Sequence, residues 1–250
     1  PLRLNLKLGD WRADILAQIF QGIMTTISTN LQAVRARIAA AAQLAGRAVE
    51  DIRLLAVSKT FPPERIREAA LAGQIAFGEN YLQESLGKIA ALADLGLEWH
   101  FIGPLQSNKT RPVAEHFSWV HGIERLKIAE RLSAARGAAR SPLQVCIQVN
   151  VSGEASKSGV SPGETAALAH AVAGLPNLRL RGLMAIPEPT DDMPLARQRF
   201  AMLRELREVL NKAGMALDTL SMGMSHDLEA AILEGATIVR VGTAIFGERT

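Results

Sequence analysis

The sequence has little of several residue types, and each shortage excludes a class of protein. It contains one cysteine, Cys146, so no disulfide can form within the chain, and a reducing cytoplasm is the expected location. Flanked by valine and isoleucine, this cysteine is expected to be a buried apolar side chain rather than a nucleophile. Aromatic residues make up only 4% of the chain, which leaves few for stacking nucleic-acid bases. No uncharged apolar run reaches about 18 residues, so we expect no membrane span.

The charged residues are balanced and mixed. The chain carries 28 Lys and Arg against 25 Asp and Glu, for a formal net charge of +3. The basic residues are scattered among acidic ones, which favours a solvated mixed surface and no nucleic-acid partner. With 48% hydrophobic residues, the chain has the composition of a globular protein with a sizeable core.

The first part of the chain differs from the rest. Residues 1–23 carry acidic residues that interrupt any secretory signal, and Met24 offers a natural start. We therefore interpret 1–23 as an N-terminal extension without an assigned function and 24–250 as one domain. Apolar residues at helical spacing then predict an amphipathic helix that begins at Thr29, with a capping box, and ends at Gly46.

After this helix, strands and helices alternate to the end of the chain. The predicted strands cover residues 53–58, 75–78, 98–102, 119–123, 143–151, 178–186, 219–222 and 237–241. About eight strands, each but the last followed by a helix, match a (β/α)₈ TIM barrel in count and length. An open doubly wound sheet has fewer strands for its length, and a three-layer sandwich is the structural alternative. The expected fold is a single-domain TIM barrel with an extra N-terminal helix.

The end of the first strand places a lysine in an apolar setting. Because side chains alternate along a strand, Leu55, Val57 and Lys59 share one face. An ordinary interpretation is that the long stem of Lys59 carries its ammonium to water. The other is a partly desolvated amine with a lowered pKa, at the mouth of the barrel, that can form a Schiff base.

Two loops near the C-terminus combine glycine with hydroxyl groups. Gly223 and Ser225 follow the seventh strand, and Gly242 and Thr243 follow the eighth. We expect Ser225 to cap the next helix. The loops after these two strands are the usual phosphate site of a TIM barrel, and both have the bare backbone and hydroxyl that close approach requires. The pair of loops therefore predicts phosphate binding.

Other polar residues also fall at strand ends. Arg240 alternates with core residues and is expected to point inward, where its guanidinium needs a partner. That partner is either a carboxylate across the barrel or a ring nitrogen or oxyanion of a ligand. Each of three further residues has an ordinary structural explanation. Asn80 can cap the next helix, His100 can be a hydrogen-bonded core histidine, and Met184 can be a packing residue.

Several longer motifs resemble those of the pyridoxal phosphate homeostasis proteins, which are single-domain relatives of the alanine racemase barrel. The similarity runs from about Thr29 to the C-terminus and departs from the family pattern at His226. The motifs that carry it are Ala56-Val57-Ser58-Lys59-Thr60, Phe77-Gly78-Glu79-Asn80-Tyr81, residues 99–109, Lys157-Ser158-Gly159, residues 181–187, Gly223-Met224-Ser225 and residues 240–247.

The resemblance implies a cofactor and a role for each site residue. It implies that Lys59 forms a Schiff base with pyridoxal 5′-phosphate (PLP) and that Arg240 faces the pyridine nitrogen. The implied phosphate ligands are Ser225, Gly242 and Thr243. By the same resemblance, Asn80 lies near the polar edge of the ring and Met184 near its face.

The implied function is that of a carrier, which holds PLP reversibly and passes it to apo-enzymes. The carrier is expected to be a monomer and not an enzyme, with at most a weak racemase activity. An amino-acid racemase is the main alternative, but it needs a second base, which racemase relatives supply as a tyrosine from an added C-terminal domain. The one tyrosine here is Tyr81, after the second strand. A more distant alternative is a Schiff-base aldolase that acts on a phosphorylated sugar.

Overall fold

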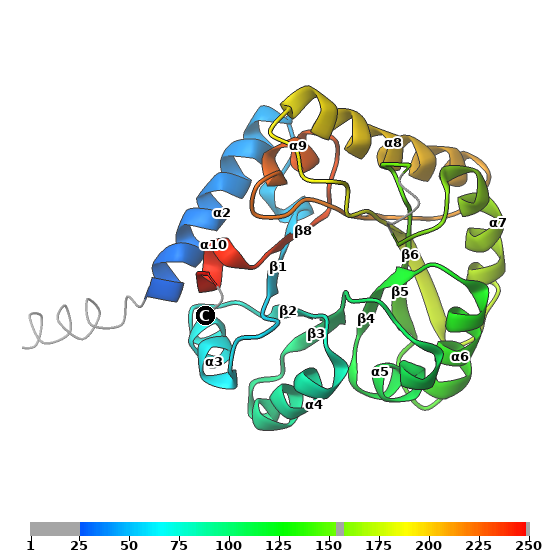
Figure 1. Cartoon of the computed structure of the whole chain (residues 1–250), viewed down its shortest axis with the longest axis horizontal. Coiled ribbons are helices and arrows are strands. Elements are labelled where there is room, and N and C mark those ends of the chain that lie inside the picture. Colours follow the sequence, from blue (N-terminus) through cyan, green and yellow to red (C-terminus); the bar gives the residue numbers. More distant parts are fainter. Residues whose placement is uncertain (1–25, 154–157, 249–250) are drawn as a thin grey trace, which may run out of the picture.

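The computed structural model describes residues 26–153 and 158–248, and in them the strands form a closed parallel barrel (Figure 1). Each strand pairs with the next along the chain, and β8 pairs with β1. The strands are β1 (Arg53–Val57), β2 (Ala76–Glu79), β3 (Glu98–Phe101), β4 (Trp119–Ile123), β5 (Leu143–Gln148), β6 (Leu178–Met184), β7 (Thr219–Ser221) and β8 (Ile238–Val241). The predicted TIM-barrel fold is confirmed. The extension 1–23 and the motif residue Lys157 lie outside the described residues.

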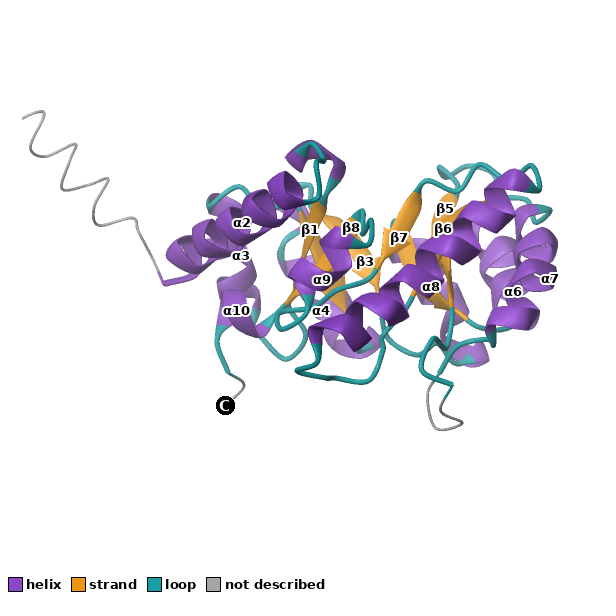
Figure 2. Cartoon of the chain, turned by 90° about the horizontal axis from the view of Figure 1, so that it is seen from above, coloured by secondary structure: helices purple, strands orange, loops and turns teal. Residues whose placement is uncertain are grey.

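Helices surround the barrel (Figure 2). They are α2 (Thr26–Leu44), α3 (Pro63–Leu71), α4 (Leu82–Ala91), α5 (Thr110–His116), α6 (Leu126–Arg136), α7 (Pro162–Ala173), α8 (Met193–Lys212), α9 (Leu228–Leu233) and α10 (Thr243–Phe246). Short 3₁₀ helices are η1 (Val49–Asp51), η2 (Ala93–Leu95) and η3 (Ser107–Lys109). The described helices include none that is long and apolar enough to cross a membrane.

One predicted helix start was wrong, and one short helix was not predicted. Thr29 does not cap the N-terminal helix, because α2 already includes Thr26 and Thr29 lies within it. The short helix α10 after the last strand was not predicted, since its four residues carry no complete helical repeat. The predicted strands at 143–151 and 178–186 end two or three residues earlier in the structure, because apolar residues continue past the last ladder pair.

The core has an inner and an outer layer, as expected from strand alternation. Leu55 and Val57 of β1 point into the barrel, whereas Ala56 between them packs outward against the helices. The inner layer contains Leu55, Val57, Ala76, Ile102, Trp119, Cys146, Met184 and Ile238. Cys146 is fully buried there, and burial raises the pKa of its thiol to about 12, so it is an apolar side chain as predicted.

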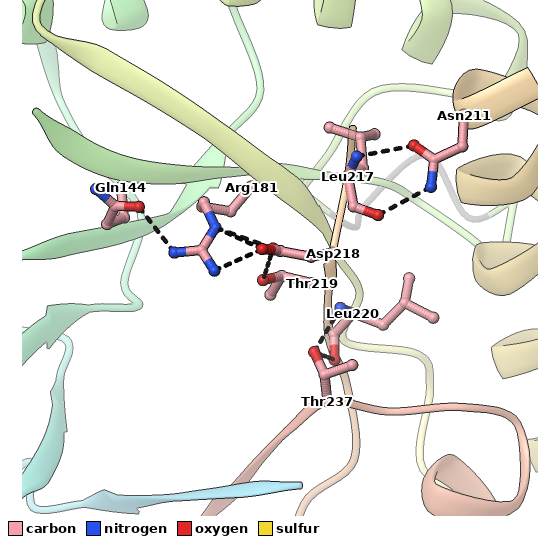
Figure 3. Close-up of polar contacts among 8 residues, drawn as sticks. All are labelled: Gln144, Arg181, Asn211, Leu217, Asp218, Thr219, Leu220 and Thr237. Atoms are coloured by element: carbon pink, nitrogen blue, oxygen red, sulfur yellow. Dashed lines mark hydrogen bonds and ion pairs between the residues drawn. The ribbon is translucent and has the colours of Figure 1, made fainter. Parts of the chain in front are cut away.

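Groups of polar contacts lie near the N-terminal ends of β5, β7 and β8 (Figure 3). Arg181 donates to both carboxylate oxygens of Asp218 and to the side chain of Gln144. The same guanidinium lies 5.0 Å from the centre of the Trp119 ring. Thr237 accepts a hydrogen bond from the backbone N–H of Leu220 at 2.9 Å. Side-chain hydrogen bonds and an ion pair therefore stabilise this end of the barrel. The opposite end carries the loops of the candidate site.

Candidate functional site

A cavity of about 190 Å³ lies at the C-terminal ends of the strands, where a TIM barrel places its functional site. Its lining consists of Val57, Lys59, Asn80, Ile102, Ile186, Met224, Ser225, His226, Arg240, Gly242 and Thr243. All the site residues predicted from the sequence are among them except Met184. Met184 is fully buried in the inner layer of the barrel and does not line the cavity.

The backbone on both sides of Lys59 is held by side chains from β2 and α4. The hydroxyl of Ser58 donates to Oε1 of Glu79 at 2.6 Å, and the carbonyl of Ser58 accepts from Nζ of Lys88 at 2.7 Å. Thr60 has a φ of 70°, which is rare for a β-branched residue, and its N–H donates to Oε1 of Glu84 at 2.7 Å. These bonds stabilise the turn that directs Lys59 toward the cavity.

The centre of this cluster is Lys88, whose side chain is only 4% exposed. Its Nζ lies 2.9 and 3.1 Å from the two carboxylate oxygens of Glu79, and it also donates to Glu84. Burial raises the pKa of Glu79, and the Lys88 ammonium and the Ser58 hydroxyl oppose that rise. Sequence reasoning missed Lys88, although its spacing from the buried Ser85 placed it on the inner face of α4.

Arg240 points into the barrel, as alternation along β8 predicted. It is 3% exposed, and its Nη1 and Nη2 donate to the hydroxyl of Ser221 at 2.8 Å and to the carbonyl of Ala185 at 2.9 Å. Within 26–153 and 158–248 no carboxylate forms an ion pair with it, so the proposed partner across the barrel was wrong. Burial lowers the pKa of Arg240 to about 10, which leaves the guanidinium charged at neutral pH.

The two glycine loops pack closely on neighbouring elements, where a side chain would not fit. Gly223 has a φ of 91°, and a Cβ there would lie 2.5 Å from the Cβ of Ala231. A Cβ on Gly242 would lie 3.1 Å from the carbonyl oxygen of Val57. Ser225 was expected to cap α9, but the N-cap is Asp227, and Ser225 lines the cavity.

The N-terminal helix α2 fixes both loops. Nδ2 of Asn30 donates to the carbonyl of Ile245 in α10 at 2.9 Å. Arg37 donates to the carbonyl of Ser225 at 3.0 Å and forms a two-pronged ion pair with Glu229. Figure 1 shows α2 beside α9 and α10. The extra helix is therefore part of the support of the site, a role that its sequence did not indicate.

Asn80 contributes a buried acceptor to the cavity. Its Oδ1 is buried, and no group in the described part of the chain forms a hydrogen bond with it. A buried amide oxygen of this kind costs free energy unless a ligand or water satisfies it. Asn80 does not cap α4, because the N-cap there is Tyr81.

Both ring nitrogens of His100 have partners, Glu98 and His121. His100 is therefore a hydrogen-bonded core histidine, which was one of its predicted roles.

Comparison with known proteins gives consistent relatives. Residues 29–250 match the family model of the alanine racemase N-terminal domain. The pyridoxal phosphate homeostasis protein of Pseudomonas aeruginosa is 65% identical over 226 residues, which cover 90% of this chain and 97% of that protein. The protein of the same name from Escherichia coli K12 is 54% identical over 234 residues, covering 90% and 98%.

Solved structures agree with these matches. PipY of Synechococcus elongatus, solved with PLP bound, is 36% identical with a TM-score of 0.78, covering 88% of this chain and 100% of that one. The alanine racemase of Corynebacterium glutamicum is 20% identical with a TM-score of 0.67, covering 89% of this chain and 61% of the racemase. The second similarity shows a shared barrel fold.

Proposed function

The chain belongs to the family of pyridoxal phosphate homeostasis proteins, and from this premise we propose that it binds PLP at the cavity and acts in the intracellular homeostasis of this cofactor. The observation that carries the proposal is the convergence of an amine, a buried guanidinium and two hydroxyl-bearing loops on one cavity. PLP supplies an aldehyde that a lysine amine can hold as a reversible Schiff base.

The residues at the cavity fit each part of PLP. Lys59 is the amine for the aldehyde, and the hydroxyls of Ser225 and Thr243 are donors for a phosphate. Gly242 lines the cavity beside Thr243 and offers a bare backbone to a phosphate at this edge. The buried Oδ1 of Asn80 is an acceptor for a hydroxyl of the ligand. Met184 is buried in the inner layer of the barrel and is not among the residues that line the cavity.

Arg240 explains why the protein would hold PLP without activating it strongly. With a pKa of about 10 the guanidinium stays protonated, and it can only donate a hydrogen bond. A donor that keeps its proton leaves the pyridine nitrogen of PLP unprotonated, so the ring withdraws electrons weakly. The site thereby favours reversible retention over carbanion chemistry.

The carrier function is also supported over the racemase alternative by Tyr81. A racemase needs a second base on the face opposite the lysine, and this tyrosine is half exposed and absent from the cavity lining. The close relatives are named as homeostasis proteins rather than as enzymes. Delivery to apo-enzymes, a monomeric state and a cytoplasmic location are further parts of the proposal.

The test is the absorption spectrum of the purified protein before and after borohydride reduction. Lys59→Ala is expected to abolish the visible absorption of bound PLP and the mass increase that reduction produces. Lys212→Ala, at an exposed position on α8, is the matched control and should leave both unchanged. A Lys59→Ala protein with the wild-type spectrum would show that another amine holds the aldehyde. Rapid formation of D-alanine from L-alanine would overturn the carrier function.

A further inference from the structure

A row of polar side chains crosses the interior of the barrel in the order Glu98, His100, His121, Ser221 and Arg240. Nε2 of His100 lies 2.6 Å from Oε1 of Glu98, and Nδ1 of His100 lies 2.9 Å from Nε2 of His121. Oγ of Ser221 lies 2.7 Å from Nδ1 of His121 and accepts from Nη1 of Arg240 at 2.8 Å. The row therefore joins β3 and β4 to the cavity through β7 and β8.

For neutral imidazoles, the chemistry at the two ends determines the direction of every hydrogen bond in this row. A guanidinium can only donate, so Ser221 accepts from Arg240, and its own hydrogen is available to Nδ1 of His121. That ring then carries its hydrogen on Nε2 and donates it to Nδ1 of the next imidazole. His100 in turn donates from Nε2 to the carboxylate of Glu98, which can only accept. Two buried neutral histidines therefore both carry hydrogen on Nε2.

The surroundings of the two rings agree with this assignment. Both histidines are fully buried, and burial lowers the pKa of His100 and lowers that of His121 well below its usual value. Trp119 stacks on His100 with ring centres 5.3 Å apart and planes 5° apart. A second hydrogen on either imidazole would point two N–H groups at each other, or an N–H at the hydroxyl hydrogen. The hydrogen bond from His100 lowers the pKa of Glu98, which keeps the acceptor end ionised.

We propose that His100, His121 and Ser221 are positioning residues for Arg240, and that together they hold its guanidinium in the orientation that donates to a ligand in the cavity. The proposal rests on the proposed function insofar as the ligand is PLP. Arg240 has no carboxylate partner among residues 26–153 and 158–248, so Ser221 and the carbonyl of Ala185 are what fix the plane of its guanidinium. Aligned hydrogen bonds in a buried chain also strengthen one another, which makes the hydroxyl a better acceptor.

The first test needs no PLP, so it is independent of the proposed function. Correlation of ring ¹H and ¹⁵N nuclei in the apo-protein at neutral pH reports which nitrogen of each histidine carries hydrogen. We expect the Nε2–H form at both His100 and His121, with His121→Gln used to assign the signals. An Nδ1–H form or an imidazolium at either ring would overturn the proposed direction of the row.

The second test measures PLP affinity and the absorption maximum of bound PLP. Ser221→Ala removes one oxygen and is expected to weaken PLP binding about tenfold and to shift the absorption maximum. His121→Leu breaks the row at its centre and should have a similar effect. His121→Gln keeps one acceptor and one donor, and is expected to bring binding back to within about threefold of wild type.

Circular dichroism of each variant separates loss of folding from loss of positioning. A folded Ser221→Ala protein with wild-type affinity and spectrum would overturn the positioning role. So would a His121→Gln variant that binds as poorly as His121→Leu while both are folded. If the wild-type protein bound no PLP, the proposed function would fail, and the ring tautomers would still decide whether the row exists.

Discussion

Replacing Lys88 with methionine removes the charge that holds the turn around Lys59 and keeps a side chain of similar length. In the structure the Lys88 ammonium lies 2.9 Å from Glu79 and 2.7 Å from the carbonyl of Ser58, and its side chain is 4% exposed. Without the ammonium, the buried carboxylate of Glu79 keeps only the Ser58 hydroxyl as a donor among these groups. Removal of one partner from a buried ion pair costs about 3 to 5 kcal/mol of unfolding free energy.

That cost converts into a measurable shift. A chain of this size loses about 2 to 4 °C of melting temperature per kcal/mol, so Lys88→Met should melt roughly 6 to 20 °C below the wild type. The double variant Glu79→Gln with Lys88→Met buries no charge and should recover most of the loss. Arg67→Met, which removes an exposed ion pair with Asp94, is the control and should leave the melting temperature nearly unchanged.

The dependence on pH gives a second readout. In Lys88→Met the pKa of Glu79 should rise further, because burial is no longer opposed by the ammonium. A carboxyl whose folded pKa exceeds its unfolded pKa stabilises the fold at low pH, and this stability is lost as pH rises toward the folded pKa. The destabilisation by Lys88→Met should therefore be larger at pH 8 than at pH 5. Urea unfolding at both pH values that gives equal losses, or losses below about 1 kcal/mol, would refute the reasoning.

Two further predictions concern the two glycine loops and the buried histidines. Ser225→Ala combined with Thr243→Val removes both hydroxyls and should weaken PLP retention, measured by dialysis, at least about tenfold. Borohydride should still attach residual PLP to Lys59. Unchanged retention would place the phosphate elsewhere. Burial lowers the pKa of His100 and His121 below 6.5, so below about pH 6.5 the unfolded chain binds more protons than the folded one. The free energy of unfolding should therefore be largest above this pH and fall as the pH decreases. His121→Gln should reduce that acid slope, and a slope unchanged by it would contradict a neutral buried ring.

The repeating pattern of the sequence was sufficient to predict the barrel. Alternation along β1 and β8 correctly placed Leu55, Val57 and Arg240 on the inner face, because strand geometry is local. The two glycine loops were found for the same reason, since a bare backbone beside a hydroxyl is visible in a few consecutive residues. Met184 is the one predicted site residue that does not line the cavity. Its backbone pairs with Ser221 inside the barrel, and this register between β6 and β7 cannot be read from a single sequence.

Helix ends and helix roles were harder to predict. Thr29 carried a capping signal but lies inside α2, in which Ile27 before it and Leu31 after it are both fully buried. The contacts of Asn30 and Arg37 with the last loops join residues about 190 or more positions apart. A single sequence contains no local signal for such contacts.

By itself, the sequence determined the class of fold, the inward lysine and arginine, and the two glycine loops at the cavity, because each depends on a short local pattern. Only the tertiary structure decided what supports them. Closure of the barrel between β1 and β8 brings Lys59 and Arg240 to one cavity, and it sets the row from Glu98 to Arg240 across four strands. The hydrogen bonds of Lys88 with Ser58 and Glu79 likewise depend on how α4 packs beside β1 and β2. The positions of these residues in the sequence do not give the distances between them.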